Sequence, residues 1–102
     1  PYLAFSVMLA AGMEGIRNNY KLSDPVEKDI FSMTAEERGA ESIDMLPGSL
    51  IEAVQGAENS KLMKKALGEH VFNKFIENKK IEWDRYRIQV SNYEIDKYLP
   101  IL

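Results

Sequence analysis

The chain has 102 residues, of which 45% are hydrophobic and 28% are charged, which indicates one globular domain or part of one rather than a disordered segment. Its formal net charge of −3 argues against binding to nucleic acid or to an anionic membrane surface, because both require a basic patch. The absence of cysteine excludes disulfide bonds, thiolate zinc sites and a cysteine nucleophile, and it suits a cytoplasmic protein.

Residues 1–19 are the most apolar segment and are predicted to be a buried helix that runs from Tyr2 to about Arg17. The stretch PYLAFSVMLAAG leaves no polar face, so we expect this helix to be covered all round. It is shorter than the roughly 20 apolar residues of a membrane span, and no basic segment precedes it as in a signal peptide. Because it also lacks an N-cap residue, we expect the helix, and the protein, to start before Pro1.

Residues 20–48 are predicted to be a loop that contains one short helical turn. Thr34 and Glu37 stand at the spacing of a capping box, in which each residue's side chain bonds the other's backbone amide. We expect the helical turn to start there and to close at Gly39.

Residues 49–68 are predicted to form two short helices. Ser49 is the expected N-cap of the first, with Glu52 as its reciprocal partner, and this helix is expected to run to about Gly56. Ser60 is the expected N-cap of the second, KLMKKAL, which should stop at the glycine that follows it.

Residues 69–90 are predicted to form the longest helix, because apolar side chains recur at spacings of three and four. The members of this stripe are Phe72, Phe75, Ile76, Lys79 through its aliphatic stem, Trp83, Tyr86 and Val90. The opposite face is charged, and there we expect Lys80 to pair with Asp84 at i, i+4.

Residues 91–102 are predicted to be a C-terminal helix followed by an apolar tail. Ser91 and Glu94 form a third capping box, and Pro100 is expected to end the helix. An apolar chain end gains nothing from exposure, so we expect the tail to dock into a pocket on its own domain or on a neighbouring subunit. Since no strand pattern is visible, the predicted fold class is mainly α.

The residues that could carry chemistry do not form a recognisable set. His70 is the only histidine, so neither a histidine metal motif nor a nucleophile–base pair can be assembled. The paired carboxylates Glu36-Glu37 and Glu82 with Asp84 lie at a helix start and on a solvated face, where acids are ordinary. The sequence therefore predicts no catalytic, cofactor-binding or metal-binding residue in this chain.

Four stretches in a fixed order carry a resemblance to a known family. They are PYLAFSVMLAAGMEGI, LPGSLIEA, ALGEHVFNKFIENKKIEWDRYRIQVS and YEIDKYLPIL. Together they resemble the C-terminal part of type I (bacterial and archaeal) glutamine synthetase over essentially all 102 residues. The resemblance implies that 1–102 is the C-terminal helical segment of an α+β catalytic domain.

The resemblance also implies an activity for the intact protein, although not for this segment alone. The family ligates ammonia to L-glutamate through γ-glutamyl phosphate, using ATP and Mg²⁺ or Mn²⁺. Its metal-binding and substrate-binding residues lie upstream of the segment that matches Pro1, so none is carried onto this chain. The segment is thus expected to be inactive by itself and to supply scaffold and subunit contacts.

Two positions gain a meaning from the resemblance. Phe31 matches the tyrosine that is adenylylated in the enterobacterial branch, and having no hydroxyl it cannot accept a nucleotide. Regulation is therefore expected by feedback inhibition, small-molecule effectors or regulatory protein partners. The family forms a dodecamer of two stacked hexamers whose C-terminal helix reaches into the opposite ring. This implies an oligomer interface at Tyr98, Leu99, Ile101 and Leu102.

Two other classes of function remain as alternatives. The first is a free-standing helical module that binds a protein partner through its first helix or its tail. A small enzyme is the weaker alternative, because no set of residues supports it. A monodisperse, cooperatively melting monomer would favour the free-standing module over a segment of a larger enzyme.

Overall fold

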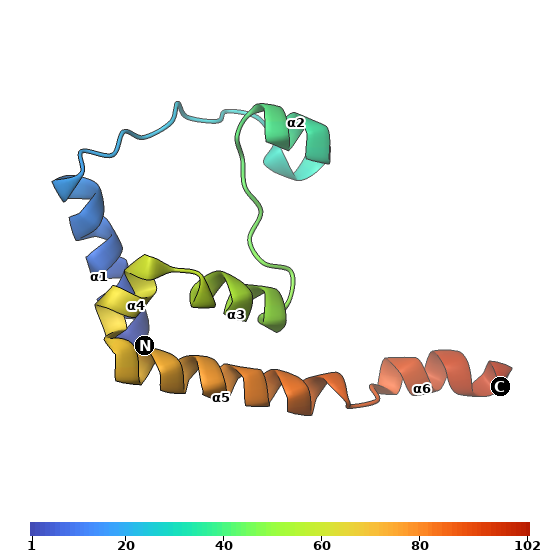
Figure 1. Ribbon diagram of the computed structural model, residues 1–102. Coiled ribbons are helices and arrows are strands. Elements are labelled where there is room, and N and C mark those ends of the chain that lie inside the picture. The colour runs from blue at the N-terminus through green and yellow to red at the C-terminus, as the bar shows by residue number, and fades with distance from the viewer.

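The computed structural model describes residues 1–102 as helices joined by loops, without strands, so the prediction of a mainly α fold is confirmed (Figure 1). The helices are α1 (Tyr2–Arg17), α2 (Ala35–Ala40), α3 (Leu50–Glu58), α4 (Lys61–Leu67), α5 (Glu69–Arg87) and α6 (Asn92–Tyr98), with 3₁₀ turns η1 (Ile30–Ser32) and η2 (Leu99–Ile101). None of these helices combines the length and the apolar character needed to cross a membrane.

The core lies where α3 runs beside α5 and α4 joins them at one end (Figure 1). Val54 on α3 and Phe72 and Ile76 on α5 are the buried residues, each with 4–6% of its surface exposed. Five half-buried apolar residues complete the cluster: Leu50, Ala57, Met63, Leu67 and Phe75. The spacing of four between Phe72 and Ile76 places both on the face of α5 that meets α3.

Local capping sets the beginnings of these helices. The Ser49 hydroxyl accepts a bond from the Glu52 amide, but the Glu52 carboxylate accepts from the Gly48 amide and not from Ser49. The expected reciprocal box at α3 is therefore only half formed. The helix also passes through Gly56, because nothing crowds that position and intrahelical bonds continue to Glu58.

Gly68 separates α4 from α5 and belongs to the cap of both helices. The Ser60 hydroxyl caps α4 by accepting from the Met63 amide at 3.1 Å, and the helix ends at Gly68 as the sequence indicates. Gly68 has φ = +76°, a left-handed backbone conformation that glycine adopts without a steric cost. The next helix can therefore start at once in a new direction.

The apolar stripe of α5 is covered as far as Trp83 and is exposed beyond it. Phe75, Lys79 and Trp83 are half-buried, whereas Tyr86 and Val90 are exposed. α5 ends at Arg87, three residues before the end of the predicted range 69–90.

The charged face of α5 pairs differently from the prediction. Lys80 reaches across to Glu58 on α3, and Asp84 pairs instead with Arg87 at 2.7 Å. The predicted Lys80–Asp84 pair was wrong because helix packing brings a carboxylate from α3 within reach of Lys80, which spacing along one helix cannot reveal.

α1 packs against α4 on one side only (Figure 1). None of its residues is buried, and Tyr2, Phe5, Met8 and Leu9 are exposed. Much of the apolar surface of α1 is thus left uncovered by this chain. The burial of residues 1–19 all round thus stays a prediction about further polypeptide.

The segment that carries η1 and α2 is folded on itself and stands away from the other helices (Figure 1). The capping box between Thr34 and Glu37 is present, and α2 continues one residue past Gly39. Lys28 pairs with Glu41, closing the segment into a loop. This closure is local and involves no contact with the core.

The chain is extended rather than compact. Its radius of gyration is 18.7 Å, whereas a compact domain of this length has about 13 Å. Its extents are 59 × 41 × 21 Å, and α6 continues outward beyond the end of α5 (Figure 1). The three buried residues therefore hold together a small part of the molecule, and the rest presents apolar side chains to its surroundings.

We expect Phe72→Ala to destabilise the α3–α5 pairing by about 3–5 kcal/mol, because it removes the largest buried side chain and leaves a cavity. Helix content of the 102-residue chain, followed by far-UV circular dichroism in increasing urea, measures the change. Val71→Ala is the matched control, since Val71 is the neighbouring residue on α5 and is exposed. Equal effects of the two substitutions would contradict the assigned core.

Candidate functional site

The residues that could act in catalysis either bond to neighbours along the chain or lie far from one another. His70 is exposed at the start of α5. Glu82 pairs with Lys79 at 2.5 Å, and Glu37 accepts bonds within the capping box of α2. No group of three or more His, Cys, Asp or Glu residues lies close enough together to hold a metal ion.

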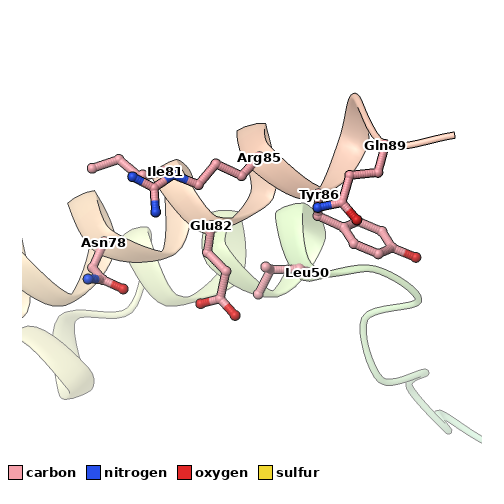
Figure 2. Close-up of a pocket in the computed structure, with 7 residues that line it drawn as sticks. All are labelled: Leu50, Asn78, Ile81, Glu82, Arg85, Tyr86 and Gln89. Carbon is pink, nitrogen blue, oxygen red and sulfur yellow. The ribbon is translucent and has the colours of Figure 1, made fainter.

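A groove of about 640 Å³ runs along α5 beside the beginning of α3 (Figure 2). Its lining residues are Leu50, Asn78, Ile81, Glu82, Arg85, Tyr86 and Gln89. The Leu50 side chain and the Glu82 carboxylate extend into the space below α5, while Arg85 lies along its upper side (Figure 2). No nucleophile stands beside a base in this groove, so the arrangement offers a surface for binding and no reaction.

A second groove, of about 530 Å³, lies where the first half of α1 meets α4 and α5. None of its lining residues carries a polar side chain: Pro1, Leu3, Ala4, Val7, Met8, Met63 and Phe75. An apolar concavity of this kind is typical of a surface that packs against other polypeptide.

Residues 91–102, which we call the C-terminal arm, form the other apolar surface. Tyr98, Leu99, Ile101 and Leu102 lie together on it, all exposed, with Leu102 fully so. The main contact of α6 with another element is with η2, the turn that follows it. The expected interface residues are thus close together along the chain and are not buried by it.

Sequence reasoning did not single out Ile95, although it belongs to the same surface. Ile95, Tyr98, Leu99 and Leu102 follow the spacing i, i+3, i+4, i+7, which places them along one face of a helical arm. Applying that spacing to the last helix would have identified the residue. We call these four residues the arm stripe.

The capping box at the start of α6 determines where the arm begins. The Glu94 carboxylate accepts from the Ser91 amide at 2.7 Å and from the Ser91 hydroxyl at 2.7 Å. The Ser91 hydroxyl in turn accepts from the Glu94 amide at 3.3 Å. These bonds from Ser91, the backbone amide first, lower the pKa of Glu94 below its ordinary value of 4.5, because they favour the ionised carboxylate.

Phe31 projects from η1 with 97% of its surface exposed. The turn below it is held by Asp29, whose carboxylate accepts from the Phe31 amide at 3.1 Å. Its ring is therefore exposed to solvent and does not pack against the rest of the chain.

Comparisons with known proteins agree with one another. Residues 1–98 match the family described as "Glutamine synthetase, catalytic domain". A glutamine synthetase of Methanococcus voltae is 48% identical over 101 residues, which cover 99% of this chain and 23% of the relative. One from Staphylococcus aureus (strain MW2) is 46% identical over 99 residues, which cover 97% of this chain and 22% of the relative. The chain thus spans less than a quarter of the length of these relatives.

We expect the helix content of the arm to fall as pH is lowered below 4.5, because protonation of Glu94 removes the favoured ionised form. The sign follows from the lowered pKa: the stabilisation is complete above the unfolded value and is lost as pH falls through the folded one. Cα chemical shifts of Asn92–Tyr98 measure this helix content.

Two variants distinguish loss of the Ser91–Glu94 capping box from other effects of low pH on the chain. Ser91→Ala should weaken α6 by about 1 kcal/mol at neutral pH, because the N-cap hydroxyl is lost. Glu94→Gln keeps a partner for the Ser91 amide and should reduce the loss of α6 helix content at acid pH. An unchanged acid transition in Glu94→Gln would show that Glu94 is not its origin.

Proposed function

Because the chain belongs to the glutamine synthetase catalytic-domain family, we propose that it acts as the C-terminal helical part of such a catalytic domain. The intact protein would be a glutamate–ammonia ligase that forms L-glutamine from L-glutamate, ammonia and ATP through γ-glutamyl phosphate. The boundaries proposed for the segment are 1–19, 20–48, 49–68, 69–90 and 91–102.

The observation that carries this proposal is the mismatch between the apolar surface of the chain and its own core. Only Val54, Phe72 and Ile76 are buried, while α1 and the arm expose contiguous apolar side chains. A helix with as many apolar side chains as α1 requires more cover than α4 provides on one side. The bulk of the catalytic domain, which the relatives contain beyond their matched quarter, is the proposed cover.

The carboxylates of this chain do not cluster as a metal ion requires. A divalent cation such as Mg²⁺ prefers clustered carboxylate oxygens, and no such cluster exists here. We therefore assign ATP and Mg²⁺ or Mn²⁺ to the rest of the enzyme, and to this chain a supporting role without catalytic residues.

The proposed assembly is a homo-oligomer, a dodecamer of two stacked hexamers in the cytoplasm, without nucleic-acid or membrane partners. Tyr98, Leu99, Ile101 and Leu102 would contact a second copy, since they are exposed at the far end of an arm that has no pocket of its own. Burying these side chains between copies would stabilise the assembly by about 25 cal/mol for each Å² of apolar surface removed from water.

A hybrid enzyme tests the proposal. In it, this chain replaces the matching 101 residues of the Methanococcus voltae relative. We expect it to form glutamine at a rate within about tenfold of that relative, because the catalytic residues are left in place and tenfold corresponds to a barrier change of only about 1.4 kcal/mol. ATP-dependent glutamine formation and native mass spectrometry are the measurements.

Deletion of residues 93–102 from the hybrid tests whether the arm is needed for assembly of the subunits. We expect the deletion to dissociate the largest assembly while leaving the matched part of the catalytic domain folded. An inactive hybrid, together with a monodisperse and cooperatively melting 102-residue chain, would favour the free-standing interaction module instead.

Phe31 gives a further prediction about regulation. Since its ring has no hydroxyl, residues 26–40 of protein purified from cells should show their unmodified mass by peptide mass spectrometry. Regulation would then act through feedback inhibition, small-molecule effectors or protein partners. A nucleotide covalently attached anywhere in residues 26–40 would overturn this prediction.

A further inference from the structure

Lys97 links two aromatic residues on the C-terminal arm. Its ammonium donates a hydrogen bond to the Tyr93 hydroxyl at 3.0 Å and lies 5.4 Å from the centre of the Tyr98 ring. The ammonium is 5.3 Å from the centre of the Tyr93 ring, so it sits at the oxygen end of Tyr93 and not over the face of that ring. One cation thus connects the hydroxyl of one tyrosine with the ring of the other.

Lys97 has no carboxylate partner, and its ammonium bonds a tyrosine hydroxyl instead. The ion pairs involve Lys28, Lys64, Lys74, Lys79, Lys80 and Arg87, and none involves Lys97. The Tyr93 hydroxyl accepts from one of the three N–H donors of this exposed ammonium, which makes no other hydrogen bond. An ammonium in this state can border a buried surface but cannot be buried within one.

The position of Lys97 on α6 is also that of a residue at the edge of an apolar surface. Tyr93 and Lys97 are four residues apart and share one face of α6, and Tyr98 belongs to the arm stripe next to that face. Contact with the cation limits the directions that the Tyr98 ring can take. A side chain that is already ordered loses less conformational entropy when it enters an interface.

We propose that Lys97 is a positioning residue of the arm, which ties the Tyr93 hydroxyl to the Tyr98 ring and marks the rim of the interface that the arm stripe forms with a second copy. This inference rests on the proposed function, in which the arm contacts a second copy. It adds an orientation: Ile95, Tyr98, Leu99 and Leu102 face inward, and Tyr93 with Lys97 stays at the edge in contact with water.

The test uses the hybrid enzyme and measures the subunit concentration at which half of the largest assembly dissociates. We expect Lys97→Met to raise this concentration about fivefold, because it keeps the length of the side chain and removes the cation. Lys97→Arg should stay within about twofold of the unchanged hybrid, since guanidinium also stacks on aromatic rings and donates to a hydroxyl. Asp96→Asn is the matched control, a neighbouring change of charge that should have no effect.

A double-mutant cycle distinguishes positioning from a general loss of helix. Tyr93→Phe removes only the hydroxyl and should weaken assembly by itself, but it should add nothing in a Lys97→Met background, because both changes break the same link. Far-UV circular dichroism of each variant should match the unchanged hybrid. Additive effects of the two substitutions on assembly would show that Lys97 and Tyr93 do not act through a shared contact.

The failures of the two proposals have different signatures. If deletion of residues 93–102 leaves the assembly intact, the arm is not an interface, and both the proposed subunit contact and the role of Lys97 are wrong. If the deletion dissociates the assembly while Lys97→Met behaves like the unchanged hybrid, the interface stands and only the inference about Lys97 is overturned.

Discussion

The contact between α3 and α5 is the one interaction on which the arrangement of the other helices depends. Val54 meets Phe72 and Ile76 there, and these are the only side chains removed from water. α4 is placed by its short connections to both helices, and α1 is placed in turn by α4. The self-closed segment and the arm lie outside this chain of contacts, so their internal order comes from caps and local bonds alone.

This division explains which features could be predicted from the sequence. The capping boxes at Thr34 and Ser91 and the N-caps at Ser49 and Ser60 are local devices, whose partners lie three residues away, and the structure contains all four caps. A pattern that needs only one turn of helix is complete in the sequence. The mainly α fold follows for the same reason, because helical spacing is a short-range signal.

The features that the sequence did not reveal depend on contacts between separate segments. Lys80 bonds Glu58 because α3 packs on α5, and the stripe on α5 is covered only as far as α3 reaches. The arm stripe could have been found from its spacing, but the bridge that Lys97 makes required side-chain positions. The proposed activity comes from family membership and not from sequence patterns or side-chain positions, because no arrangement of residues in this chain suggests the formation of glutamine.

Gly68 makes the direction of the arm sensitive to a single backbone angle. It is the point where α5 leaves the α1–α4 pair, and α5 then runs for 19 residues, about 28 Å, before the arm begins. α5 acts as a lever, so a change of about 10° at Gly68 displaces the start of the arm by roughly 5 Å, which is close to the width of a side chain. The direction of the outermost apolar residues thus depends in part on a residue at the opposite end of the longest helix, one that has no side chain.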